Sequence, residues 1–424
     1  MIWLLFISFF VFLFLGFPIA YSLGLSSFIY LLFAGIPLVI VPLKMYSGID
    51  VFVLLSIPGF VLAGNLMNLC GMTDRIVRFC NHLLGHVRGG LSLANIGASM
   101  VFSGISGTAV ADTASIGSIM IPAMKKEGYD GDFSCAVTAS SSTVGPIIPP
   151  SLPLIIAGSL TGLSIGKLFL AGAVPGVLLT LGFMTAAYII SRKRKYPKKE
   201  RAGFRLVISG FFDAFWALVM TLLILFGIVA GVFTPTEASI VAVLYALAVG
   251  AFIYRSVNIR GLVTVLKQSV NTTASLMLLV GFANLFGWIL VSEQVPQQVA
   301  SSLLGISTNK IVLLLLINLL LLVVGSFMET IAALLILFPI LLKVAVSVGI
   351  DPIQFSVVAV LNLMIGLNTP PVGVCLFVAS GIGKEPIERI TRQALPFLLV
   401  SFIVLMLVSY VPQISLFLPG LFIE

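Results

Sequence analysis

The stretch that decides the fold is residues 97–162, GASMVFSGISGTAVADTASIGSIMIPAMKKEGYDGDFSCAVTASSSTVGPIIPPSLPLIIAGSLTG. It lies between apolar runs, yet Gly, Ser, Thr and Pro recur throughout it. In hydrocarbon every backbone N–H and C=O group needs a partner, so interrupted backbone persists only where protein or a watery cavity supplies one. In secondary transporters, Gly- or Pro-interrupted segments at matching places in two repeats indicate a substrate and ion site. We therefore looked for a second copy.

A second copy lies in the C-terminal half. Asp112-Thr113 recurs as Glu329-Thr330, an offset of 329 − 112 = 217 residues. The same offset relates Pro122 to Pro339, Pro18 to Pro235 and Gly64 to Gly281. After a four-residue insertion the offset is 221, and it relates Gly128 to Gly349, Asp130 to Asp351, Gly145 to Gly366, Pro149-Pro150 to Pro370-Pro371, Ser159 to Ser380, Gly162 to Gly383 and Pro175 to Pro396. General enrichment of Gly and Pro in membrane helices is the alternative explanation, but it does not predict a shared register.

The composition describes a membrane protein. Of 424 residues, 59% are hydrophobic and 9% charged, and the mean hydropathy is +1.20. These values exclude a soluble domain and predict several membrane-spanning helices. The four cysteines have no paired spacing, which predicts packing residues instead of disulfides or a metal site: Cys70, Cys80, Cys135 and Cys375. The N-terminus has no basic region and no A-x-A site, so we expect a retained first helix.

Positive charge is concentrated in one loop. The net charge is 23 − 15 = +8, and residues 192–205 (RKRKYPKKERAGFR) hold eight Lys/Arg and one Glu. The positive-inside rule predicts that this loop is cytoplasmic. Binding of nucleic acid or anionic lipid by the loop is the alternative. We expect membrane lipids, and no nucleic acid, among the partners.

Apolar runs predict the spanning segments, which are 2–15, 18–41, 51–69, 168–190, 206–232, 238–254, 270–291 and 395–418. Two longer runs, 91–121 and 311–340, are interrupted by small residues, which is typical of a re-entrant hairpin. Two further segments, 133–144 and 355–366, are each followed by a Pro pair, and a new apolar segment begins after each pair. Residues 255–267 are polar and precede the expected span 270–291.

Residues 73–88 form an amphipathic stretch that contains both histidines of the chain. His82 and His86 are four residues apart and share a helix face. A metal pair is one interpretation, but no further ligand is nearby in the sequence. An interfacial helix lying in the headgroup region is the interpretation we prefer.

The interrupted segments supply the oxygen atoms that a sodium ion requires. A helix unwound at mid-membrane frees carbonyl groups and exposes the positive N-terminal end of the next half-helix. Carbonyl and hydroxyl oxygens are the ligands of hard cations. We predict a first cage formed by Ser103, Ser106, Val144, Gly145 and Pro146. The predicted second cage is Gly325, Gly366, Asn368 and Thr369. Close helix packing through small residues is the alternative role.

Asp112 and Glu329 are repeat-equivalent acids inside apolar segments. Intramembrane acids are functional candidates, and these two could carry protons. They could instead accept hydrogen bonds from backbone freed by the nearby break, which is the role we favour.

The runs GISGTAVADTASIGSIMIPAM, SSSTVGPIIPPS and GLNTPPVGVCLFV resemble the large membrane subunit of tripartite ATP-independent periplasmic (TRAP) transporters. The resemblance covers essentially the whole chain. It implies sodium-driven import of an acidic solute across the bacterial inner membrane, with a periplasmic substrate-binding protein and a small four-helix membrane subunit. No such four-helix unit is visible in this chain, so a separate small subunit is expected. The sequence taken as a whole, and no single motif, favours a sialic-acid member over a C4-dicarboxylate member.

The resemblance also implies an all-α polytopic fold with two inverted repeats, each with a re-entrant hairpin and a discontinuous helix. An elevator-type transport domain would move against a scaffold. The expected segments are scaffold 1–90, transport 91–175, helix and basic loop 176–205, scaffold 206–310, transport 311–396 and a C-terminal helix 397–424. The moving site would take its substrate contacts from the hairpin tips and breaks: Thr108, Ser142, Thr143, Pro150, Ser326 and Thr330.

Three other functions were weighed. A single-component sodium/dicarboxylate or citrate carrier would share the repeat and both breaks without needing partners. An intramembrane enzyme would need a nucleophile–base set or an HExxH or GxSxG motif. The sequence has no HExxH motif, and its one GxSxG match, residues 162–166 (GLSIG), has no histidine near it in the sequence, since both histidines lie in the amphipathic stretch 73–88. A channel would also use oxygen-lined breaks, but paired asymmetric cages suit alternating access better than a continuous pore.

Overall fold

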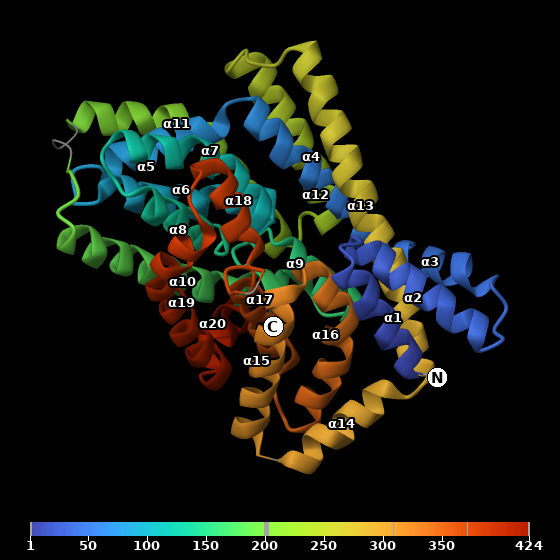
Figure 1. Ribbon diagram of the computed structural model, residues 1–424. Helices are drawn as coiled ribbons and strands as arrows, with labels where there is room; N and C mark the ends of the chain where they lie inside the picture. The colour runs from blue at the N-terminus through green and yellow to red at the C-terminus, as the bar shows by residue number, and fades with distance from the viewer. Residues whose placement is uncertain (1, 199–202, 308, 371, 423–424) are drawn as a thin grey trace.

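The computed structural model describes residues 2–198, 203–307, 309–370 and 372–422, without the side chains of 103–106, 204, 296, 300, 303, 304 and 306. Within these residues the chain forms twenty α-helices and two short helices of other types, and it has no strand (Figure 1). Eight of the described helical segments are long and apolar enough to cross a membrane. The predicted all-α polytopic fold is confirmed.

The first half contains α1 (Ile2–Phe14), α2 (Ile19–Phe33), α3 (Ile40–Ile49), η1 (Phe52–Leu55), α4 (Ser56–Leu69), α5 (Met72–Leu84), α6 (Gly90–Ser106), α7 (Ala109–Lys126), α8 (Gly131–Ser142), α9 (Leu152–Thr161) and α10 (Ile165–Lys193). The second half contains α11 (Phe204–Val229), α12 (Pro235–Ala248), η2 (Val249–Ile253), α13 (Ile259–Ser292), α14 (Val295–Ile306), α15 (Lys310–Phe327), α16 (Thr330–Ser347), α17 (Pro352–Gly366), α18 (Val374–Gly383), α19 (Ile387–Tyr410) and α20 (Gln413–Phe422).

Local sequence signals explain where several helices begin. At α12 the hydroxyl of Thr234 accepts a hydrogen bond from the Glu237 N–H, at 3.3 Å, and the Glu237 carboxylate accepts one from the Thr234 N–H, at 2.8 Å. This reciprocal capping box, with Pro235 at the first helical position, satisfies donors that the helix start would leave unpaired. Asp351 likewise caps α17 by accepting from the N–H groups of Ile353 and Gln354.

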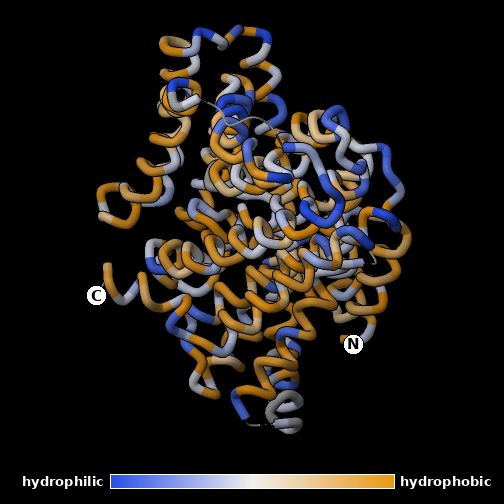
Figure 2. Tube along the Cα trace, turned by 90° about the vertical axis from the view of Figure 1, so that its left-hand side faces the viewer, coloured by the Kyte–Doolittle hydropathy of each residue, from blue (hydrophilic) through white to orange (hydrophobic). Residues whose placement is uncertain are grey.

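Two groups of helices can be distinguished by their packing. In one group α4 packs on α12, and α13 packs on α2, α3 and α4. In the other group the pairs α6–α7 and α15–α16 pack around α8, α9, α17 and α18. Figure 1 shows α1–α3 to one side of the molecule, beside the lower part of α13. Figure 2 shows hydrophobic residues along most of the tube, with hydrophilic segments gathered near one end.

The halves exchange partners. The half-helix α9 of the first half packs on α16 of the second, and α18 of the second half packs on α7 of the first. Each hairpin arm thus carries the half-helix of the opposite half. This exchange fits the predicted repeat, whose inverted orientation and domain boundaries stay predictions.

Two expected spans are wrong, and two helical segments were not predicted. The expected span 18–41 is divided into α2 and α3 because Gly35 takes a positive φ of +67° after α2. Most of the polar residues 255–267 form the start of the 34-residue α13, so this helix begins well before the expected span 270–291, and the Asn258 side chain accepts from the Gly261 N–H at 2.6 Å. The expected span 395–418 ends at Tyr410, and Pro412 precedes a separate α20. The helix α14 was not predicted.

The start of the basic loop is held against α8. Arg194 forms an ion pair with Asp130, with 2.7 Å between Nη1 and Oδ2, and the Tyr196 hydroxyl donates to the same oxygen at 2.6 Å. Burial, together with the hydrogen bond to Asp130, raises the pKa of Tyr196 to about 12. These contacts fix residues 194–196 beside the start of α8. They do not decide on which side of the membrane the loop lies.

Candidate functional site

The first hairpin turns where the small residues of the sequence predicted. The helix α6 ends at Ser106, Gly107 adopts a positive φ of +63°, and Thr108 is the N-cap of α7. A Cβ atom on Gly107 would lie 2.8 Å from Cγ of Leu152, the first residue of α9. The tip of the first hairpin therefore contacts the segment that follows the first break. The side chains of Ser103 and Ser106, predicted as sodium ligands, lie outside the described residues.

The first break, residues 143–151, separates α8 from α9 because Pro149 and Pro150 have no backbone N–H to donate. Two of the three carbonyl groups predicted as sodium ligands, those of Val144 and Pro146, already have partners. The Val144 carbonyl accepts from the N–H groups of Ile147 and Ile148, at 3.1 and 3.2 Å. The Pro146 carbonyl accepts from the Ser151 hydroxyl, which itself accepts from the N–H of Leu154. A carbonyl oxygen has two lone pairs, so these bonds leave room for an ion, but they also stabilise the break without one.

Hydroxyl groups of the first break mostly turn back onto α8. The hydroxyls of Ser142 and Thr143 donate to the carbonyls of Thr138 and Ser140, at 2.8 and 2.7 Å. Both side chains are buried. The hydroxyl of Ser140 is buried and has no hydrogen-bond partner in the described part of the chain. A buried polar atom without a partner is costly, and it is suited to a ligand or a water molecule.

The second hairpin meets the second break through two glycines. A Cβ atom on Gly366 would lie 2.3 Å from the carbonyl carbon of Gly325 and 2.6 Å from its Cα and O atoms. The backbone of α15 therefore touches the end of α17, and only glycine fits at Gly366. Gly325 and Gly366, both predicted as ligands of the second cage, are therefore in contact. Whether this junction binds sodium is a separate question.

Asn368 connects the second break to the first half. Its amide nitrogen donates to the carbonyl of Ala139 in α8 at 3.1 Å. Its amide oxygen is buried and accepts no hydrogen bond from any described residue. Thr369 is half-buried, and its hydroxyl donates to the Ile365 carbonyl at 2.8 Å. The unpartnered amide oxygen makes Asn368 the side chain of the predicted cages that best fits a hard cation.

The two intramembrane acids are placed differently. Glu329 is the N-cap of α16, and its carboxylate accepts from the N–H groups of Ile331 and Ala332, at 2.9 and 3.3 Å. This is the backbone-capping role that we favoured from the sequence. Asp112 is fully buried in the first turn of α7. The remaining predicted substrate residues, Ser326 and Thr330, flank Glu329 and are buried; the Ser326 hydroxyl donates to Val323 O at 2.7 Å.

Two polar contacts, each between a hairpin helix and an interrupted helix, were not predicted from the sequence. The hydroxyls of Ser99 in α6 and Ser141 in α8 lie 2.8 Å apart. In the second half Asn362 of α17 donates to the backbone and side-chain oxygens of Asn318 in α15, at 2.9 and 3.0 Å. Ser141 and Asn362 are related by the 221-residue offset, so the repeat register could have revealed them.

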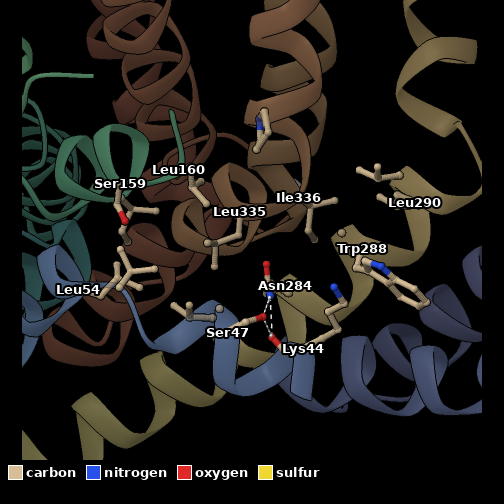
Figure 3. A pocket seen from close by; sticks show the side chains of 18 of the residues that line it. Lys44, Ser47, Leu54, Ser159, Leu160, Asn284, Trp288, Leu290, Leu335 and Ile336 are labelled. Carbon is tan, nitrogen blue, oxygen red and sulfur yellow. Dashed lines mark hydrogen bonds between the residues drawn. The ribbon is translucent and has the colours of Figure 1, made fainter. Parts of the chain in front are cut away.

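A hollow lies beside the hairpins. It has a volume of about 480 Å³ and is bounded by α3, η1, α9, α13 and α16 (Figure 3). Its wall on α3 and α13 is fixed by Asn284, whose amide nitrogen donates to the Lys44 carbonyl at 2.7 Å and the Ser47 hydroxyl at 3.3 Å. The opposite wall includes Leu335 and Ile336 of the second hairpin. The hollow therefore lies between part of the hairpin group and α3, while α16 and α13 also pack on each other directly.

Helical hairpins that meet interrupted helices inside an apolar helical protein define a multi-pass membrane permease. The family model "Tripartite ATP-independent periplasmic transporter, DctM component" matches residues 6–414. The chain therefore belongs to the DctM component family of tripartite ATP-independent periplasmic transporters, which are transporters and not enzymes. The resemblance found in the sequence is confirmed.

Individual relatives agree with this assignment. The chain is 46% identical to the sialic acid TRAP transporter large permease protein SiaM of Vibrio cholerae, over 97% of this chain and 96% of that one. It is 40% identical to the C4-dicarboxylate TRAP transporter large permease protein DctM of Pseudomonas aeruginosa, over 94% of each chain. The crystal structure of the Alcanivorax borkumensis YdaH transporter shares the fold, with a TM-score of 0.60, 16% identity and coverage of 87% of this chain and 85% of that chain.

Proposed function

We propose that this chain is the permease that carries an acidic solute inward on a sodium gradient, with sialic acid as the favoured solute. The observation that carries the proposal is the junction of Gly325 with Gly366, where two backbones meet two residues before Asn368, whose amide oxygen is buried and has no partner among the described residues. Backbone carbonyls and an amide oxygen form a ligand set that suits sodium, which is here a co-transported substrate.

The relatives support the choice of solute. The Vibrio cholerae relative named for sialic acid is 46% identical, and the Pseudomonas aeruginosa relative named for C4-dicarboxylates is 40% identical. Both solutes are carboxylates, so an acidic solute follows from either. Sialic acid is proposed on the higher identity, and a C4-dicarboxylate is the second candidate.

The family description as a tripartite periplasmic transporter supports two partners. We assign these to a periplasmic substrate-binding protein and a small four-helix membrane subunit. The setting is the bacterial inner membrane, with the basic loop 192–205 in the cytoplasm.

The packing supports an elevator-type movement. The hairpins and interrupted helices pack on one another, and the hollow beside Leu335 and Ile336 lies between part of this group and α3, although α16 also packs directly on α13. A group that is held together internally and has open space beside it can slide as one body along its neighbour. In this proposal α6–α9 and α15–α18 move, and α4, α12 and α13 stay in place.

Uptake into proteoliposomes tests the proposal. The vesicles contain this chain and its small-subunit partner, and radiolabelled sialic acid is supplied with and without the cognate binding protein. We expect uptake that requires both the binding protein and an inward sodium gradient. Uptake without the binding protein would instead indicate a single-component carrier. Uptake of succinate but not of sialic acid would select the C4-dicarboxylate alternative, and uptake that is indifferent to sodium would refute the coupling.

A further inference from the structure

The hollow between α3, α9, α13 and α16 has a single charged residue in its lining. This residue is Lys44 on α3, which is half-buried and forms no ion pair within the described part of the chain. Its ammonium group lies 5.3 Å from the centre of the Trp288 ring on α13. A cation held over an aromatic face is partly desolvated while it keeps its charge, so it can still attract an anion from the hollow.

Lys44 lies on a side of the hollow that is fixed by hydrogen bonds, and the opposite side is apolar. Asn284 holds α3 in place through the Lys44 carbonyl and the Ser47 hydroxyl, which limits the positions that the Lys44 side chain can reach. Figure 3 shows Lys44, Asn284 and Trp288 on one side, with Leu335 and Ile336 opposite them. An apolar cavity with a few convergent polar groups is the usual form of a small-molecule site.

A second hollow provides an internal comparison. It has a volume of about 580 Å³, lies between α4, α7 and α13, and is lined by residues 261–268 of α13, whereas the first is lined by residues 280–291. In the 217-residue register Lys44 corresponds to Gly261, since 44 + 217 = 261. The second hollow has polar but no charged lining residues, among them Asn65, Asn68 and Gln268. The two hollows thus flank α7 and α16, the repeat-equivalent arms, and only one of them has a cation.

We propose that Lys44 and Trp288 form an anion subsite that binds the carboxylate of the transported solute in the hollow beside α16. The proposal rests on the proposed function, because it assigns a contact to the solute of that function. The solute is held by its charge in this hollow and is released more readily from the uncharged one. A phospholipid headgroup could also pair with a Lys–Trp set near a membrane surface. We commit to the solute because the opposite wall is formed by the hairpin arm and the half-helix α9.

Fluorescence of Trp288 tests the subsite directly. The chain contains three tryptophans, so replacing Trp3 and Trp216 with Phe leaves Trp288 as the reporter. The full chain in phosphatidylcholine nanodiscs is titrated with N-acetylneuraminate, with succinate, and with the uncharged methyl ester of N-acetylneuraminate. We expect a saturable change with an acid and none with the ester. Lys44→Gln should weaken binding about tenfold and Lys44→Arg by less than about threefold, since Arg keeps the charge-assisted bond. Lys267→Gln, an exposed lysine of α13, is the control for loss of a charge.

Uptake measured on the same variants separates the two proposals. Lys44→Gln should raise KM about tenfold and leave the sodium concentration for half-maximal uptake unchanged. An unchanged KM in a transporting Lys44→Gln variant would overturn the subsite and leave the proposed function intact. A Trp288 response to acids in a protein that shows no sodium-driven uptake would leave the subsite and overturn the function. A Trp288 response to added phosphatidylglycerol, with none to either acid, would assign the hollow to lipid and overturn the subsite.

Discussion

The contact between Gly325 and Gly366 can be tested with one methyl group. In Gly366→Ala the new Cβ would lie 2.3 Å from the Gly325 carbonyl carbon, whereas ordinary contact begins at 3.4 Å. The two backbones must therefore separate by 3.4 − 2.3 = 1.1 Å, and neither is a side chain that can rotate away. Overpacking of this kind typically costs about 1–3 kcal/mol. The hairpin tip would move away from the interrupted helix.

Sodium-dependent uptake measures the effect. If the separation weakens only the ion-bound state, the half-maximal sodium concentration rises roughly 5- to 150-fold. Two further glycines form a graded series. A Cβ on Gly325 would lie 3.2 Å from Leu363 Cα, a shortfall of 3.4 − 3.2 = 0.2 Å, and one on Gly381 would meet nothing within 4 Å. We expect a small effect for Gly325→Ala and none for Gly381→Ala.

The relative sizes of the effects on sodium dependence in the three variants decide whether this junction binds sodium. A folded Gly366→Ala protein with the sodium dependence of the unmodified chain would refute the assignment of this junction to sodium. Equal losses in Gly366→Ala and Gly381→Ala would show that uptake reports general helix damage instead. Thermal unfolding of each purified variant distinguishes a lost ion site from a lost fold.

Three other predictions concern the same machinery. Alanine at Ser103, Ser106 or Thr369 should raise the half-maximal sodium concentration several-fold, and unchanged sodium dependence in folded protein would remove those residues from the cages. Glu329→Ala should lose the cap of α16 and destabilise the protein by about 0.5–2 kcal/mol, measured by thermal unfolding. Glu329→Gln keeps an acceptor oxygen, so this variant should still transport. A Glu329→Gln protein that folds but cannot transport would favour a proton-carrying role. Neutralising the basic residues of 192–205 should disturb membrane orientation without changing the sodium affinity of correctly inserted protein, and labelling of this loop by a reagent confined to the periplasm would contradict the orientation.

The breaks were predictable because their causes are local. A glycine at positive φ between Ser106 and Thr108 and a proline pair after α8 interrupt helices whatever surrounds them. The repeat register then transferred the prediction to the second half. The sequence therefore located both hairpin turns and both interruptions within a few residues.

Contacts between distant segments were not predictable in the same way. Lys44 and Asn284 are separated by 240 residues, and nothing in either segment indicates the other. The exchange of α9 and α18 between halves follows from tertiary packing, which hydropathy does not report. The polar start of α13 was not predicted because hydropathy marks only the apolar part of a helix, whereas the Asn258 cap and packing against neighbours make the start helical as well.

In the proposed elevator-type movement, the two hollows would allow one helix to serve both states of the transporter. α13 contributes residues 280–291 to the hollow beside α16 and residues 261–268 to the hollow beside α7. The arms α16 and α7 are connected through their partners, since Asn368 of the second break donates to Ala139 of α8, which packs on α7. If these helices move along α13 as one body, a displacement that narrows one hollow widens the other. In the proposed function, the cation on only one side would set where the acidic solute is held more tightly.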